Sequence, residues 1–325
     1  MKITSSDVSP DQNSRITGLL KKQGAIIALA LLVLVISVAS PQFRTVSNLL
    51  SLLRQASING VIAFGMTCVI LTGGIDISVG AMLGFSAMLG AGFLKGGFPE
   101  QLAIPLMLLL GLGLGAINGS LVTLGSLQPF IATLITMTAY RGFCLIYGNG
   151  KPISSLGEQP LLNSVGRGAF AGVPIPVWIL LLMFALFFFI LNKTTLGRRI
   201  YAVGSNSVAA RLAGVNIKRT KMFVYSASGL MSALAGLVLL SRLGSAQPTL
   251  GSGYEIDAIA ATALGGTSMS GGSGKIYGTM VGVLIIAILS NGLNILGVSS
   301  YYQDVVKSVV ILLAVLSDRG RQSSV

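Results

Sequence analysis

Apolar stretches separated by short polar segments recur along almost the whole chain. Only 10% of its 325 residues are charged and 53% are hydrophobic, whereas about 25% of the residues of an ordinary globular protein carry a charge. A chain with so few charged side chains cannot cover a water-facing surface, so much of its exterior must face lipid. The composition therefore predicts an integral membrane protein.

The apolar stretches predict an all-α fold of about ten transmembrane helices, because roughly 20 helical residues cross a bilayer core of about 30 Å. The first stretch is expected to remain as a span rather than to be cleaved as a signal peptide. The stretch 258–264 is short, so a broken or partly re-entrant helix is an alternative to a complete span there. The ten stretches cover residues 25–39, 57–71, 77–94, 102–124, 130–147, 175–191, 222–240, 258–264, 276–296 and 305–316.

Basic residues set the expected orientation of these helices. Residues 192–221 carry seven Lys or Arg and no acidic residue, and such segments stay in the cytoplasm. With ten crossings and both termini in the cytoplasm, fourteen basic residues fall on the cytoplasmic side and six on the outside. The net charge of +13 therefore indicates topology rather than binding to nucleic acid. The six outside residues are Arg44, Arg54, Lys95, Lys151, Arg167 and Arg242.

The residue types needed for catalysis or metal binding are scarce. The chain has no His, and Cys68 and Cys144 lie in apolar stretches, where we expect buried, unreactive side chains. Residues 271–275 are glycine-rich and end in Lys275, yet Met269 and Ile276 stand where a Walker loop needs Gly and Ser or Thr. We therefore expect no catalytic residue, metal site, cofactor or nucleotide site.

A few ionisable residues lie in or near the spans, where charge is costly and functional roles are common. Asp76 is expected at an inner helix junction as a hinge or helix cap, and Arg141 lies within a span. Asp304 and Lys307 are expected to pair along one helix, and Asp257 lies near a helix end. None of these acidic residues indicates proton or sodium coupling.

Small residues at four-residue spacing predict close helix packing. These residues are Gly111, Gly115 and Gly119, Gly80 and Gly84, and Gly278 and Gly282.

One segment resembles a known family closely. Its residues read Gly73-Gly74-Ile75-Asp76-Ile77-Ser78-Val79-Gly80. They resemble the Gly-Gly-Ile-Asp-Leu-Ser-Val-Gly signature of the permeases of ribose-type, ATP-driven sugar importers. The pattern of residues 204–214 predicts a short helix that ends at Gly214, a position that commonly takes a positive φ. These residues are similar to the family's cytoplasmic coupling loop. Residues 246–249, 253–261, 264–268, 291–294 and 297–303 resemble its later motifs, so the resemblance extends over residues 21–318.

The resemblance implies a bacterial inner-membrane permease without enzymatic activity of its own. It implies a cytoplasmic tail at residues 1–23, one transmembrane domain at 24–318 with a coupling loop at 192–221, and a second tail at 319–325. It also implies three partners besides the lipid bilayer: an ATP-binding subunit, a periplasmic sugar-binding protein and a second permease copy.

Residues that contact the ATPase in this family carry over to the coupling loop of this chain. The sequence departs from the family at Ser207-Val208-Ala209, where coupling loops often read acidic-Ala-Ala. The residues carried over are Ser207, Val208, Ala209, Ala210, Arg211, Leu212 and Gly214.

Other functions remain open at the level of sequence. Within the sugar importers, ribose is the first choice, and xylose, arabinose, galactose or a signalling furanosyl molecule are alternatives. A secondary transporter or facilitator that acts without ATP also has many spans and glycine-broken helices. A membrane enzyme is a weaker alternative, because no nucleophile–base pair or metal constellation is present.

Overall fold

The protein is almost entirely helical. The structure, a computed structural model, describes residues 12–322 and the side chains of 24–310 and 312; the two chain ends therefore lie outside the described residues. A small antiparallel pair, β1 (Ala169–Phe170) and β2 (Val173–Pro174), accompanies the helices. The helices are α1 (Gln12–Ala39), the 3-10 helix η1 (Pro41–Arg44), α2 (Val46–Leu71), α3 (Val79–Lys95), α4 (Glu100–Thr123), α5 (Pro129–Tyr147), α6 (Pro160–Arg167), α7 (Ile175–Lys193), α8 (Thr195–Ser205), α9 (Ser207–Leu212), α10 (Ile217–Leu243), α11 (Tyr254–Leu264), α12 (Ile276–Ile295) and α13 (Ser300–Gln322).

Each of the ten apolar stretches lies within or largely within a helix, which confirms an all-α membrane protein. Six helices are long and apolar enough to cross a bilayer: α2, α4, α5, α7, α10 and α12. The apolar parts of α1 and α3 are shorter. The total of ten crossings and the orientation of the two ends remain predictions.

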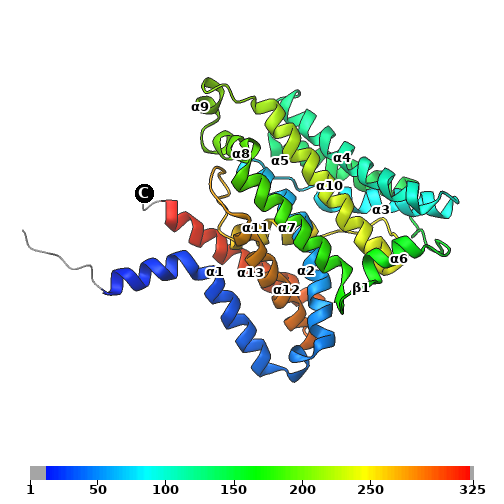
Figure 1. Ribbon diagram of the computed structural model, residues 1–325, viewed down its shortest axis with the longest axis horizontal. Helices are drawn as coiled ribbons and strands as arrows, with labels where there is room; N and C mark the ends of the chain where they lie inside the picture. Colours follow the sequence, from blue (N-terminus) through cyan, green and yellow to red (C-terminus); the bar gives the residue numbers. More distant parts are fainter. Residues whose placement is uncertain (1–11, 323–325) are drawn as a thin grey trace, which may run out of the picture.

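The interior is built around α2, which packs against α7, α10, α11 and α12 (Figure 1). Its second half is buried on all sides, from Ala56 to Leu71. A helix buried all round must be apolar all round, and its sequence there is dominated by Ile, Val, Ala and Met. Both cysteines are buried and free, as expected.

Glycine allows α4 and α10 to pack closely. A side chain at Gly111 would collide with Ala233, and one at Gly115 would collide with the backbone of Tyr225. Gly278 and Gly282 of α12 lie in the same way against the backbone of α11. These two series confirm the predicted close helix packing.

Gly80 and Gly84 contact an irregular segment instead of a helix. Residues 244–253 follow α10, re-enter the helical body and bring the carbonyls of Leu250 and Gly251 against these two glycines. Arg141 on α5 holds the segment, because its Nη1 donates to Leu250 O at 2.6 Å and to Pro248 O at 3.2 Å. The irregular backbone at this depth is thus covered by protein, as a membrane interior requires.

The re-entrant segment explains the short apolar stretch at 258–264. The helix α11 begins at Tyr254 and has 11 residues, about 16 Å at 1.5 Å per residue. That length covers about half of a bilayer core. The structure therefore favours the broken-helix alternative over a complete span.

The two ends of the helical body differ. Near one end lie α8 and α9, and near the other lie α6 and β1 (Figure 1). At the α6 end, the carboxylate of Glu100 accepts hydrogen bonds from Leu161 N and Leu162 N at 3.0 and 2.9 Å. In the same region, Arg167 Nε donates to Arg242 O at 3.2 Å.

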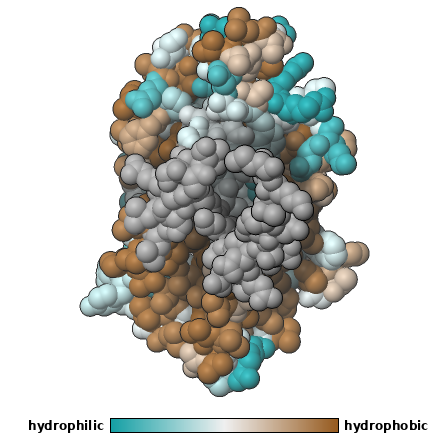
Figure 2. All heavy atoms as spheres, turned by 90° about the vertical axis from the view of Figure 1, so that its left-hand side faces the viewer, coloured by the Kyte–Doolittle hydropathy of each residue, from teal (hydrophilic) through white to brown (hydrophobic). Residues whose placement is uncertain are grey.

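The hydropathy of the surface follows the same division. Seen from the left-hand side of Figure 1, apolar residues cover most of the lower part of the face, and most of the hydrophilic residues lie in the upper part (Figure 2).

Candidate coupling site

The basic segment between α7 and α10 folds into two short helices. Thr194 caps α8 by accepting from Gly197 N at 3.2 Å, and Asn206 caps α9 by accepting from Ala209 N at 2.9 Å. The sequence pattern predicted one short helix over residues 204–214. That prediction was wrong at its start, because Gly204 belongs to α8 and the side chain of Asn206 begins a new helix.

One face of α9 exposes apolar side chains. Val208 is 68% exposed and Leu212 is 85% exposed, whereas Ala210 on another face is buried. Residues four apart lie on the same side of a helix, so Val208 and Leu212 form one apolar patch. Ser207, Ala209 and Arg211 are also exposed. We call Val208 and Leu212 the apolar patch of α9.

Gly214 ends α9 in the left-handed conformation, as the glycine pattern predicted. Its φ is +81°, and its N–H donates to Arg211 O at 3.0 Å. Val215 N donates to Ala210 O at 2.9 Å. A side chain at Gly214 would meet no atom within 4 Å, so the backbone conformation alone requires glycine there.

The helix α8 fastens this segment to the helical body. Ile200 and Val203 are buried, and a side chain at Gly204 would collide with Leu71 O and Gly272 N. Tyr201 Oη donates to Gly274 O at 2.9 Å. Burial raises the pKa of Tyr201, so its hydroxyl stays protonated and can donate.

The glycine-rich loop of residues 271–275, which superficially resembles a phosphate loop, packs against α8 and the end of α2. Gly272 N donates to Leu71 O at 3.0 Å, and Gly271 lies against both Gly73 and Gly204. The loop therefore joins α8 to the end of α2. It lies between α8 of the coupling loop and Gly73 of the signature segment.

Most of the signature segment is buried between α2 and α3, and Gly73 is exposed. Gly73 has a φ of +75°, and a side chain at Gly74 would meet the hydroxyl of Tyr225. Asp76 is fully buried. Its Oδ1 accepts from Ser78 N at 3.0 Å and Ser78 Oγ at 2.6 Å.

Partners of Asp76 from other helices were not predicted from the sequence. Asn118 Nδ2 on α4 donates to Oδ1 at 3.4 Å, and Ser228 Oγ on α10 donates to Oδ2 at 3.1 Å. The sequence gives one hint that these two residues have buried partners: both are polar residues within apolar stretches. The carboxylate thus ties α4 and α10 to the start of α3.

The arrangement offers contact surfaces rather than reaction chemistry. Within the described part of the chain, no three His, Cys, Asp or Glu side chains are grouped so that they could hold a metal ion. What the segment presents to its surroundings is the apolar patch of α9 with Arg211 beside it.

Comparison with known proteins points to one family. Residues 48–315 match the family described as the permease component of branched-chain amino acid transport systems. The ribose import permease of Bacillus subtilis is 53% identical over 306 residues, which cover 94% of this chain and 95% of the relative. That of Haemophilus influenzae is 47% identical over 94% of this chain and 95% of the relative.

The D-allose transport system permease of Escherichia coli is 38% identical over 92% of this chain and 91% of the relative. No solved structure matches the chain.

Proposed function

This chain belongs to that permease family of ABC importers, and from this premise we propose that it is the membrane-spanning subunit of an ATP-driven importer that carries ribose into the cytoplasm. The high identity to ribose import permeases over nearly the full length supports ribose. The lower identity to the D-allose permease favours ribose over a hexose.

The chain is a multi-pass protein of the bacterial inner membrane. Permease subunits of ABC importers are not enzymes themselves, and they work with an ATP-binding subunit and a periplasmic binding protein. In our proposal the separate ATP-binding subunit hydrolyses ATP, the binding protein delivers ribose, and a second copy of this chain completes the pathway.

The proposed topology has ten crossings with both ends in the cytoplasm. One transmembrane domain covers residues 24–318, with tails at 1–23 and 319–325. Two observations support it: basic residues are concentrated on one predicted side, and α8 and α9 lie opposite α6 and β1 (Figure 1). Reporter fusions after Arg211 and at the C-terminus should both report the cytoplasm. A periplasmic signal at either position would contradict this topology.

The ATP-binding subunit docks on α9, at residues 207–212 and Gly214. The apolar patch of α9 carries this proposal, because two neighbouring apolar side chains that face water on a basic helix are typical of an interaction site. No acidic residue lies in residues 192–221, so Arg211 is free of a partner within its own loop. The signature residues Gly73, Gly74, Asp76, Ser78 and Gly80 hold the junction against which α8 rests.

Uptake by the reconstituted transporter tests the function. The permease, its ATP-binding subunit and its binding protein are placed in proteoliposomes with ATP on the cytoplasmic side, and entry of labelled ribose is followed. We expect ATP-dependent uptake that disappears when residues 205–214 are deleted. Uptake without ATP that survives the deletion would instead indicate a secondary transporter.

A further inference from the structure

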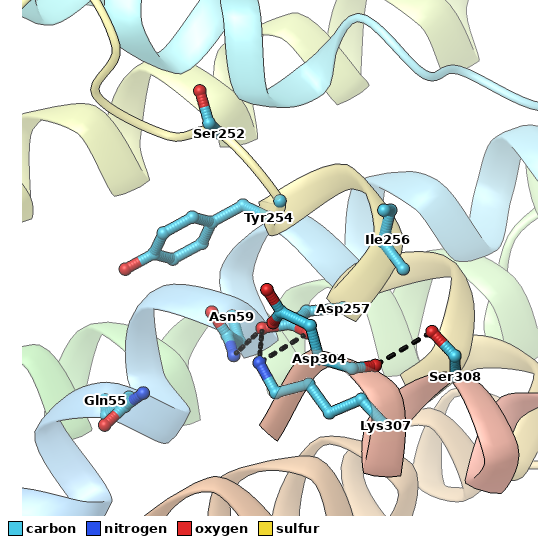
Figure 3. A pocket seen from close by; sticks show the side chains of 10 residues that line it. Gln55, Asn59, Ser252, Tyr254, Ile256, Asp257, Asp304, Lys307 and Ser308 are labelled. Atoms are coloured by element: carbon cyan, nitrogen blue, oxygen red, sulfur yellow. Dashed lines mark hydrogen bonds and ion pairs between the residues drawn. The ribbon is translucent and has the colours of Figure 1, made fainter. Parts of the chain in front are cut away.

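A polar pocket opens inside the helical body, beside the start of α11 (Figure 3). Its volume is about 360 Å³, near the lower end of the roughly 300–1,000 Å³ of small-molecule sites. Its walls come from α2, the re-entrant segment, α11 and α13. The lining residues used below are Gln55, Asn59, Ser252, Tyr254, Asp257, Asp304 and Lys307.

The pocket lies about halfway along α2, one of the helices long and apolar enough to cross a membrane. Asn59 is close to the midpoint of α2, which has 26 residues and spans the body. The helix α11 runs about 16 Å from the pocket to Gly265, beyond which the chain reaches the glycine-rich loop beside α8. In many transporters, substrates bind near the midplane at helices that are interrupted in this way.

Three charged side chains line the pocket: the carboxylates of Asp257 and Asp304 and the ammonium group of Lys307. Lys307 Nζ lies 3.2 Å from Asp257 Oδ1, and Asn59 Nδ2 donates to Asp257 Oδ2 at 3.4 Å. The sequence predicted that Lys307 would pair with Asp304 along α13. That prediction was wrong, because the carboxylate of Asp257 on α11 faces Lys307 across the pocket (Figure 3). The wall therefore offers both carboxylate acceptors and an ammonium donor to a polar ligand.

Two amide side chains in the pocket wall have hydrogen-bonding atoms without a partner among the described residues. Asn59 is 3% exposed, and its Oδ1 has no hydrogen-bond partner among the described residues. That oxygen is enclosed, so the amide that a ligand can reach is the one on Gln55. Gln55, one turn earlier on α2, also lines the pocket, and its amide makes no hydrogen bond within the described part of the chain. The ring of Tyr254 lies above both amides (Figure 3).

We propose that this pocket is a transient binding site for the hydroxyl groups of the transported sugar, halfway along the permease. Gln55 accepts from and donates to sugar hydroxyls, and Asp257, Asp304 and Lys307 offer further acceptors and a donor. The ring of Tyr254 supplies an apolar face for the C–H side of the sugar. This inference rests on the proposed function, since it assumes that a sugar crosses this protein.

Substitution at Gln55 tests the pocket without removing a hydrogen bond from the described structure. In the reconstituted transporter, Gln55→Leu should lower ribose uptake by about five- to tenfold, as expected for one lost hydrogen bond. The ATP-binding subunit should still copurify at the wild-type level. The matched control is Gln101→Leu, an exposed glutamine on α4 outside the pocket, which should transport normally.

Chemical protection provides an independent measurement. Ser252 is exposed at the pocket rim, so a Ser252→Cys variant should react with a water-soluble thiol reagent, and ribose in the working transporter should slow the reaction. The native chain serves as the blank, because Cys68 and Cys144 are buried. Ser154→Cys, at an exposed site in the loop after α5, should react at a rate that ribose does not change.

The outcomes separate this inference from the proposed function. If the native transporter imports ribose but Gln55→Leu is normal and ribose does not protect Ser252→Cys, the pocket is a structural polar cluster and the inference is wrong. If the native transporter fails to import ribose, the proposed function itself is wrong.

Discussion

The exposed helix α9 and the buried segment of residues 72–78 lie near the same end of the molecule but have opposite surroundings. In α9 the side chains of Val208 and Leu212 are 68% and 85% exposed. In the buried segment, Asp76 is fully enclosed and accepts hydrogen bonds from three residues. A buried carboxylate whose hydrogen bonds come from its own chain serves the architecture. A helix that exposes apolar side chains to water can bury them against a partner protein.

The largest effect is expected from Asp76→Ala. The change leaves Ser78, Asn118 and Ser228 as buried donors without their acceptor, and each such group costs about 1–3 kcal/mol. We expect the free energy of unfolding to fall by about 3–5 kcal/mol, which would greatly reduce membrane abundance. Abundance by immunoblot and the melting temperature in detergent measure the effect.

The variant Asp76→Asn is the matched control, since it keeps an oxygen that can accept from Ser78. Abundance should largely recover, and the pH dependence of uptake should stay as in the native transporter. A marked shift of the pH profile in this variant would contradict a structural role and favour proton coupling.

The double variant Val208→Asp, Leu212→Asp should have the next largest effect, on docking rather than on folding. Each apolar side chain contributes about 1.5–3 kcal/mol when it is buried, so the ATP-binding subunit should bind at least about 100-fold more weakly. Abundance and melting temperature should not change, because both residues are exposed. Unchanged binding would show that the patch faces no ATPase. A fall in abundance as large as that of Asp76→Ala would remove the contrast between the two regions.

The variant Gly214→Val should have an intermediate effect. A β-branched residue at φ of +81° is strained by about 1–3 kcal/mol, so the end of α9 should change shape. We expect binding of the ATP-binding subunit and ribose uptake to fall about tenfold at equal membrane abundance. Gly214→Asn should lose less, because Asn enters the left-handed region more readily. Equal, native-like values for both variants would reject Gly214 as part of the coupling site.

The variant Arg211→Ala should have the smallest effect. An exposed ion pair contributes about 0–1 kcal/mol, so docking should weaken by no more than about fivefold. The loss should shrink further in high salt, which screens exposed charges. Binding measured at low and high ionic strength tests this, and a loss larger than that of the double variant would mean that charge rather than apolar contact dominates docking.

The sequence predicted the features that depend on local pattern. The apolar stretches correspond to helices because a span must be apolar along its length. Gly214 was expected at a left-handed helix end, and the φ of +81° agrees with it. The start of α9 was not predicted, although Asn206 is of a residue type that commonly caps the N-terminus of a helix.

Features that depend on distant contacts could not be predicted. Arg141 was recognised within a span, but its acceptors are backbone carbonyls of Pro248 and Leu250, which no sequence pattern marks. Helical spacing suggested that Asp304 pairs with Lys307, whereas Asp257 on another helix faces Lys307 instead. A competing partner brought by tertiary packing cannot be read from spacing alone.

Photo-crosslinking from α9 tests the central claim, that the ATP-binding subunit docks there, most directly. A photoreactive residue is placed at Val208 and, as the control, at Phe170 of β1, which is also apolar and 68% exposed but lies at the α6 end. In membranes that contain the complete transporter, we expect the ATP-binding subunit to be crosslinked from position 208 and not from position 170. Crosslinking from position 170, or none from position 208 in an active transporter, would contradict the account.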